Sequence, residues 1–272
     1  MVERVTVGPV TIGGGRLAVI AGPCVIESLE LCLGVARAVK AACDALELGY
    51  IFKASFDKAN RTARDAYRGP GLEQGLEILA AVKREVDVPV LTDIHEAWQA
   101  ERSAEVADVL QIPAFLARQT DLLLAAARTS RAVNVKKAQF MAPWDMRAVI
   151  EKLTGAGNRR LLLTERGTCF GYNNLVVDFR GLVVLRSLGF PVVYDATHSL
   201  QLPGGLGTAS GANREYAPHL LRAAAAVGVD ALFLETHPDP DRALSDAAAQ
   251  LPLKDVPALL QSAKAVHEAV SS

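Results

Sequence analysis

The stretch Tyr50-Ile51-Phe52-Lys53-Ala54-Ser55-Phe56-Asp57-Lys58-Ala59-Asn60-Arg61 begins as an apolar run and ends as a basic, polar cluster. The run predicts a buried strand over residues 50–55, followed by a loop. The strand end and the loop carry cationic groups and neutral donors of the kind that bind phosphate and hydroxyl oxygens: Lys53, Ser55, Lys58, Asn60 and Arg61. A solvated basic loop has a similar composition. Comparable polar clusters follow other strand-like segments of the chain, and they favour the binding interpretation.

Apolar, β-branched runs of this kind recur about every thirty residues, and each precedes a segment with helical periodicity or an alanine-rich composition. The predicted strands cover residues 17–22, 50–55, 88–92, 109–112, 132–136, 160–164, 192–195 and 231–235. The predicted helices cover residues 29–46, 71–86, 95–106, 120–129, 144–154, 174–188, 216–227 and 243–249. Eight alternating pairs predict an α/β fold, the (β/α)8 TIM barrel. Residues 5–16 predict a short N-terminal β-hairpin that closes the bottom of the barrel.

The main alternative fold is an open, doubly wound parallel sheet. Neither a G-x-G-x-x-G after the first strand nor a G-x-x-x-x-G-K-[ST] occurs, and Gly13-Gly14-Gly15 precedes the first strand instead of following it. The chain of 272 residues is also close to the usual size of one barrel. Since no linker or change of composition divides it, we predict one barrel domain over residues 1–272.

The composition predicts a cytoplasmic protein that binds small molecules. Half of the residues are hydrophobic and the formal net charge is −1, which argues against a nucleic-acid-binding or anionic-membrane surface. The N-terminus lacks a basic region followed by an apolar one, and no apolar run approaches roughly 18 residues. The four cysteines include no CxxC pair, which fits a reducing compartment.

In a TIM barrel the functional groups gather at the carboxyl ends of the strands. Each predicted strand here ends in polar or functional residues: Cys24; Lys53 and Ser55; Asp93 and His95; Gln111, Pro113 and Phe115; Lys136, Lys137 and Gln139; Glu165 and Arg166; Asp195 and His198; Glu235 and His237. Solvation alone does not require such a set at one end of a barrel. We therefore predict an active site at this mouth.

The polar residues of the mouth divide into two groups. The cations could hold two phosphates, or a phosphate and a carboxylate, and they are Lys53, Lys58, Arg61, Lys136 and Arg166. The second group mixes a thiol, an imidazole and carboxylates, which suits Zn²⁺, Fe²⁺ or Mn²⁺ better than Mg²⁺ or Ca²⁺: Cys24, His198, Glu235 and Asp246. Their spacing along the chain is not diagnostic, so the residues alone leave open whether a metal ion binds here. They equally leave open whether the glycine-rich segment 201–211 is a lid or a plain loop.

With these motifs the chain resembles the 3-deoxy-D-manno-octulosonate 8-phosphate synthases, in their metal-dependent class, over nearly its whole length. The matching segments are Ala21-Gly22-Pro23-Cys24-Val25-Ile26-Glu27-Ser28, residues 53–61, Leu91-Thr92-Asp93-Ile94-His95-Glu96, Gln111-Ile112-Pro113-Ala114-Phe115, Val133-Asn134-Val135-Lys136-Lys137, Leu163-Thr164-Glu165-Arg166-Gly167, Asp195-Ala196-Thr197-His198-Ser199 and Glu235-Thr236-His237-Pro238.

The resemblance implies an aldol-type condensation of phosphoenolpyruvate with D-arabinose 5-phosphate and water, in the pathway that supplies this sugar to lipopolysaccharide. It implies that phosphoenolpyruvate is bound by Lys53, Ser55, Gln111, Ala114, Lys136 and Arg166. It implies that arabinose 5-phosphate is bound by Lys58, Asn60, Arg61, Pro113, Phe115 and Ser210. The catalytic residues on this basis are Lys53, Asp93, His95, Lys136 and His198.

The resemblance also implies a divalent metal ion and a homotetramer. The metal-dependent class has a cysteine where the metal-independent class has asparagine, and Cys24 occupies that position; the other implied ligands are His198, Glu235 and Asp246. The chain departs from the family where Thr62-Ala63 replaces a frequent pair of serines and Thr208-Ala209 replaces a more charged pair. Both departures concern the side of the pentose phosphate.

Three other functions compete with this interpretation. The related synthase that uses erythrose 4-phosphate, 3-deoxy-D-arabino-heptulosonate 7-phosphate synthase, has a Lys-Pro-Arg-Thr type segment where this chain has Lys58-Ala59-Asn60-Arg61. A sialic-acid-type synthase takes an unphosphorylated sugar and does not need Arg61 in a phosphate cluster. A sugar-phosphate-binding sensor without activity would be expected to lack part of the cationic set or of the metal-ligand set, and both sets are intact.

Overall fold

The computed structural model describes residues 2–205 and 210–271. Parallel strands form a closed barrel, in which each strand pairs with the next one and β11 pairs with β14 to complete the ring. The barrel strands are β3 (Ala18–Gly22), β4 (Gly49–Lys53), β5 (Val90–Asp93), β6 (Val109–Ile112), β7 (Ala132–Lys136), β8 (Leu161–Glu165), β11 (Val192–Asp195) and β14 (Ala231–His237). The predicted (β/α)8 barrel is therefore confirmed.

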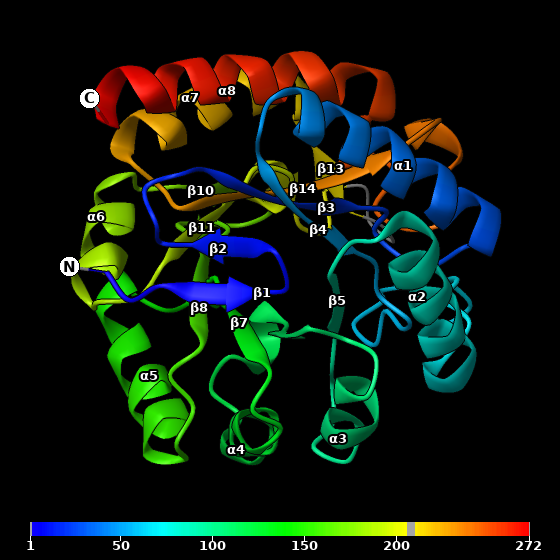
Figure 1. Ribbon diagram of the computed structural model, residues 1–272, viewed down its shortest axis with the longest axis horizontal. Coiled ribbons are helices and arrows are strands. Elements are labelled where there is room, and N and C mark those ends of the chain that lie inside the picture. Colours follow the sequence, from blue (N-terminus) through cyan, green and yellow to red (C-terminus); the bar gives the residue numbers. More distant parts are fainter. Residues whose placement is uncertain (1, 206–209, 272) are drawn as a thin grey trace.

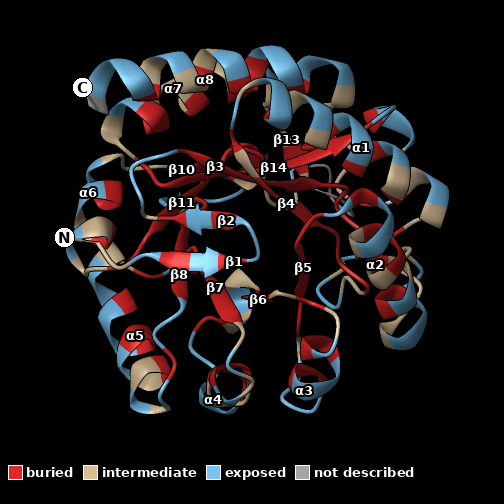
Figure 2. Ribbon diagram, in the orientation of Figure 1, coloured by how far each residue is buried: buried red, intermediate tan, exposed pale blue. Residues whose placement is uncertain are grey.

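Within the described residues, α-helices surround the barrel on its outside (Figure 1). They are α1 (Leu29–Ala45), α2 (Leu72–Val86), α3 (Gln99–Ala104), α4 (Thr120–Arg128), α5 (Met146–Gly155), α6 (Arg180–Ser187), α7 (Ala217–Val227) and α8 (Val256–Ser271). Figure 2 shows the barrel strands buried and the outer faces of the helices exposed. Strands buried on both faces read as continuous apolar runs, which is why periodicity located them well. None of the described helices is both long and apolar enough to span a membrane.

The N-terminal hairpin covers the bottom of the barrel, as predicted. Strands β1 (Val5–Val7) and β2 (Val10–Ile12) pair antiparallel around a turn that contains Gly8, whose φ is +55°. Alternate hairpin residues are buried, and they join one apolar cluster with inward-facing barrel residues such as Ile20 and Phe233. Because this cluster fills the lower part of the barrel, only the opposite end is free to hold a site.

The predicted helix at 243–249 is wrong. This alanine-rich stretch is irregular and lies between a short 3₁₀ turn, η5 (Pro240–Arg242), and the strand β15 (Leu251–Pro252), while the eighth helix is α8. Asp246 has a φ of +47°, which no α-helix tolerates, and Arg61 donates hydrogen bonds to the side chains of Ser245 and Asp246. These tertiary contacts override the helix propensity of alanine.

Two other helices, α6 and α3, start at least four residues later than predicted. In the segment predicted as 174–188, β10 (Leu175–Val176) pairs with β9 (Thr168–Cys169), and α6 begins only at Arg180. In the segment predicted as 95–106, the Gln99 side chain accepts from the backbone N–H groups of His95 and Glu96 and so holds a turn before α3. The segment 201–211 begins and ends in paired strands, β12 (Gln201–Leu202) and β13 (Gly211–Ala212). The middle of this glycine-rich segment, residues 206–209 with Thr208 and Ala209, lies outside the described residues, and the choice between a lid and a plain loop stays open.

Candidate active site

A cavity of about 730 Å³ opens at the carboxyl ends of the barrel strands. The predicted site residues that line it are Lys58, Asn60, Arg61, Asp93, His95, Gln111, Pro113, Ala114, Phe115, Lys136, Arg166, His198, Ser210, Glu235 and Asp246. The structure thus brings these residues from all parts of the chain to one mouth. Cys24, Lys53 and Ser55 do not line the cavity, because they are fully buried beneath its floor.

The buried lysine under the floor is paired with a carboxylate. Lys53 Nζ donates to Glu235 Oε1 at 2.5 Å and to the Cys24 carbonyl oxygen at 2.8 Å. Lys58 Nζ lies 3.7 Å from both Glu235 and Asp93. Burial alone raises the pKa of Glu235, but attraction to Lys53, His198 and Lys58 outweighs it and holds the pKa below the usual range. Glu235 is therefore ionised.

Asp93 ends a chain of hydrogen bonds that runs across neighbouring strands. Its carboxylate accepts a hydrogen bond from the hydroxyl of Ser55, which follows β4, and another from Gln111 Nε2 at 2.5 Å. Gln111 Oε1 accepts from Asn134 at 2.7 Å, and the Asn134 oxygen accepts from Thr164 at 2.6 Å. Asn134 and Thr164 were not among the predicted site residues. Each precedes a predicted strand-end residue in a buried run, which was the available signal.

Asp195 holds two side chains of the mouth at once. Its Oδ2 accepts from Lys136 Nζ and lies 2.7 Å from His198 Nδ1. Lys136 Nζ also lies 3.3 Å from the centroid of the ring of Phe233, which belongs to the apolar cluster that the hairpin and the barrel strands form. Burial lowers the pKa of Lys136 to about 8, and the Asp195 carboxylate, which raises it, offsets only part of this effect.

Three of the four predicted metal ligands cluster closely. One ligand atom from each of Cys24, Glu235 and Asp246 lies within 4.8 Å of the others, and His198 Nε2 lies 3.7 Å from Glu235 and 3.9 Å from Asp246. Glu235 Oε2 is buried and has no hydrogen-bond partner among the described residues. A buried carboxylate oxygen without a partner is costly unless a ligand satisfies it.

The chemistry of these donors fits a divalent ion of the zinc, iron or manganese type. Burial raises the pKa of the Cys24 thiol well above its usual value, and the Glu235 carboxylate raises it further. The thiol lies 3.0 Å from Ser245 Oγ. An ion at this position would therefore have to displace the thiol proton, as in other cysteine-ligated sites.

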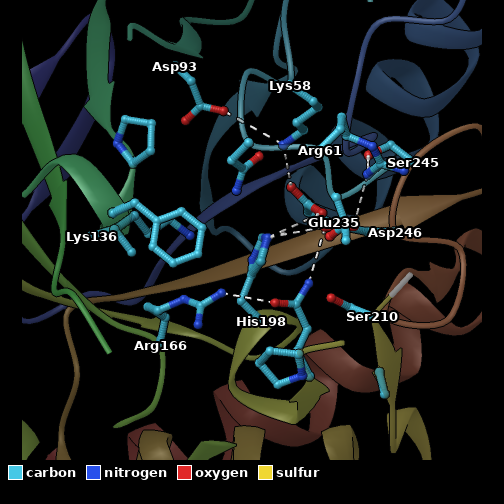
Figure 3. A pocket seen from close by; sticks show the side chains of 18 of the residues that line it. Lys58, Arg61, Asp93, Lys136, Arg166, His198, Ser210, Glu235, Ser245 and Asp246 are labelled. Carbon is cyan, nitrogen blue, oxygen red and sulfur yellow. Dashed lines mark hydrogen bonds and ion pairs between the residues drawn. The ribbon is translucent and has the colours of Figure 1, made fainter. Parts of the chain in front are cut away.

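Cations lie on both sides of the His198–Glu235 pair. Figure 3 shows Lys136 and Arg166 on one side of it and Arg61 with Asp246 on the other. Arg166 is 6% exposed; its Nη2 donates to Gln201, while its Nη1 has no hydrogen-bond partner among the described residues. A buried guanidinium with a free donor that faces a cavity is suited to bind an anion.

The chain is similar to known proteins over nearly its whole length. The family model described as the DAHP synthetase I family matches residues 3–272. The chain belongs to this family. It is 57% identical over 272 residues to the 2-dehydro-3-deoxyphosphooctonate aldolase of Cyanothece sp. and 55% identical over 272 residues to that of Geobacter sp., with both chains of each pair fully covered. It is 54% identical over 270 residues to the protein of that name from Fusobacterium nucleatum. This match covers 99% of this chain and 97% of the relative.

Proposed function

We propose that the protein condenses phosphoenolpyruvate with D-arabinose 5-phosphate and water to give 3-deoxy-D-manno-octulosonate 8-phosphate and phosphate. The observation that carries this proposal is the pair of cationic groups on either side of one cysteine–histidine–carboxylate cluster. Two anionic substrates need two such groups, and a reaction that joins them needs both groups in one cavity. The full-length relatives named 2-dehydro-3-deoxyphosphooctonate aldolase support the same activity.

The division of the cavity follows from its two sides. Phosphoenolpyruvate would lie at the side of Lys136 and Arg166, with Gln111 and the neighbouring Ala114. Arabinose 5-phosphate would lie at the side of Lys58, Asn60 and Arg61, with further contacts from Pro113, Phe115 and Ser210. Lys53 and Ser55 would act through other residues. Their side chains do not reach the cavity, and they donate hydrogen bonds to Glu235 and Asp93, which line it.

The reaction forms one carbon–carbon bond and one carbon–oxygen bond, and it breaks the carbon–oxygen bond that joins C2 to the phosphate. C3 of phosphoenolpyruvate attacks the aldehyde carbon, water adds at C2, and phosphate leaves with the C2–O bond electrons. The oxygen that came from water becomes the C2 ketone oxygen and loses both of its protons: one goes to the new alkoxide and the other to the departing phosphate. Asp93 and His95 are the candidates for handling these protons, because both line the cavity and His95 Nδ1 has no hydrogen-bond partner among the described residues.

We propose that Cys24, His198, Glu235 and Asp246 hold a divalent ion. An ion of this type supplies Lewis acidity, which polarises a carbonyl oxygen or lowers the pKa of a water. The unpartnered Oε2 of Glu235 and the mixed sulfur, nitrogen and oxygen donors support this assignment. We also propose that the chain works as a single-domain, cytoplasmic homotetramer.

The Cys24→Asn variant tests the metal assignment. Asparagine is the residue of the metal-independent class at this position, so we expect the variant to keep part of its activity after chelation, whereas the wild-type protein loses activity. The measurement is the rate of phosphate release before and after treatment with a chelator. A variant that depends on metal as strictly as the wild type would show that Cys24 is not a ligand. Cys43→Ser, at a buried cysteine far from the cavity, is the matched control.

The synthase that uses erythrose 4-phosphate remains the competing enzyme, because the matched family model carries the name of that activity. The Lys58-Ala59-Asn60-Arg61 segment lines the cavity in place of a Lys-Pro-Arg-Thr type segment, and this favours the pentose phosphate. A non-catalytic sugar-phosphate sensor is disfavoured, since both the cations and the candidate metal ligands are present in one cavity.

A further inference from the structure

One buried carboxylate, Asp195, makes five hydrogen bonds directly behind the cavity. Its exposed fraction is 0% and it is not among the residues that line the cavity. Oδ2 contacts Lys136 Nζ and His198 Nδ1, and Oδ1 accepts from the Thr197 backbone N–H, the Thr197 hydroxyl and the His198 backbone N–H. Asp195 therefore contacts a cation of the phosphoenolpyruvate side and a candidate metal ligand at the same oxygen.

The partners of Asp195 fix its chemical state. A lysine ammonium and backbone N–H groups can only donate, so both carboxylate oxygens must act as acceptors. With Oδ2 already accepting from Lys136, the contact with His198 is satisfied when Nδ1 carries the proton. The lone pair of His198 then lies on Nε2, which is the nitrogen that faces Glu235 and Asp246. Asp195 thus determines which histidine nitrogen is available to a metal.

The contact with Lys136 crosses the barrel interior. Lys136 ends β7 and Asp195 ends β11, and β8 lies between these two strands in the sheet. Local pairing therefore does not bring the two residues together; their inward direction does. Lys136 stays at the mouth because it is held between this carboxylate and the face of Phe233. A shift of Asp195 would move both Lys136 and His198.

We propose that Asp195 is a positioning residue that serves both halves of the site: it presents His198 Nε2 to the metal and holds Lys136 for phosphoenolpyruvate. This inference rests on the metal ligands and the substrate division of the proposed function. It assigns no contact between Asp195 and the pentose phosphate, because Arg61 and Asn60 do not bond to it. Loss of Asp195 should therefore weaken the binding of the metal ion and of phosphoenolpyruvate, and leave the binding of arabinose 5-phosphate nearly unchanged.

The variant to test is Asp195→Asn, which keeps the size of the side chain but places N–H donors where only acceptors fit. We expect the dissociation constant for Co²⁺, measured by titration of the metal-free protein, to rise about 10- to 100-fold, as for other residues that orient metal ligands. We expect KM for phosphoenolpyruvate to rise by at least the same factor as the dissociation constant for Co²⁺. KM for arabinose 5-phosphate should change by less than about twofold.

The matched control is Asp230→Asn. Asp230 is also a buried carboxylate paired with a cation, Arg186, and it accepts from the Val192 backbone N–H, but it precedes β14 at the opposite end of the barrel. We expect this variant to lose stability with an unchanged Co²⁺ affinity. Wild-type Co²⁺ affinity in Asp195→Asn, or equal rises of both Michaelis constants, would overturn the inference. A wild-type protein that binds no Co²⁺ would instead overturn the metal assignment of the proposed function, and the metal half of this inference with it.

A second measurement needs no change to Asp195. In ¹⁵N-histidine-labelled wild-type protein without metal, the resonances that disappear in the His198→Gln variant belong to His198. We expect them to report a proton on Nδ1. A proton on Nε2 in place of Nδ1 would contradict the inference even if Asp195→Asn fails to fold.

Discussion

Replacing Arg166 with alanine should lower kcat/KM for phosphoenolpyruvate by about 30- to 4,000-fold. Arg166 is buried at the cavity wall, forms no salt bridge with a described carboxylate and has an unpartnered Nη1, so its charge is available to a substrate anion. Removing one partner of a desolvated, hydrogen-bonded charge pair costs about 2–5 kcal/mol, and each 1.4 kcal/mol is a factor of about ten. Steady-state kinetics with each substrate varied in turn provide the measurement.

Arg61→Ala is the matched control for this prediction, because it removes a guanidinium from the other side of the same cavity. We expect it to raise KM for arabinose 5-phosphate far more than KM for phosphoenolpyruvate, and Arg166→Ala to give the reverse pattern. If each variant raised both constants equally, the two sides of the cavity would not correspond to the two substrates.

The Glu235→Gln variant should lose both metal affinity and stability. Glu235 offers an unpartnered oxygen to the proposed metal and is the carboxylate partner of Lys53, whose side chain is fully buried. A buried lysine without its counter-charge costs about 3–5 kcal/mol of folding free energy. We expect the free energy of unfolding in urea to fall by about that amount, and phosphate release with added metal to fall to near the background rate.

The double variant Lys53→Met/Glu235→Leu separates the two effects. It removes both charges and introduces two apolar side chains of similar volume. Such a replacement of a buried ion pair is often neutral for stability. We expect it to recover most of the stability that Glu235→Gln loses while it remains inactive and without tight metal binding. Full activity in either variant would remove Glu235 from the site.

The barrel was predictable because its strands are buried on both faces and its functional residues follow strand ends. Strands β6, β7 and β11 begin and end where the apolar runs predicted. The segment 243–249 was not, because its alanine-rich composition favours a helix while Ser245 and Asp246 bind Arg61 and the backbone of Asp246 is left-handed. The helix over residues 256–271 was not predicted, although Val256, Leu259, Leu260 and Ala263, which α8 buries, follow an amphipathic pattern.

The site residues were predictable as a set, since residue type and position after a strand suffice to collect them at one mouth. Their pairing was not. Nothing in the sequence distance between Lys136 and Asp195 indicates that they meet across the barrel, or that Asn134 supports Gln111. Such contacts depend on side chains that point inward from strands that are not neighbours. The position of a charged residue along the chain does not determine the direction of its side chain.

Phosphate release from phosphoenolpyruvate tests the central claim most directly. It is measured with arabinose 5-phosphate or with erythrose 4-phosphate, each before chelation, after chelation, and after Zn²⁺ or Mn²⁺ is added back. We predict release with the pentose phosphate alone, lost on chelation and restored by the metal. Release with erythrose 4-phosphate in its place would contradict the assigned substrate, release that persists after chelation would contradict the metal site, and no release with either sugar would favour a binding protein.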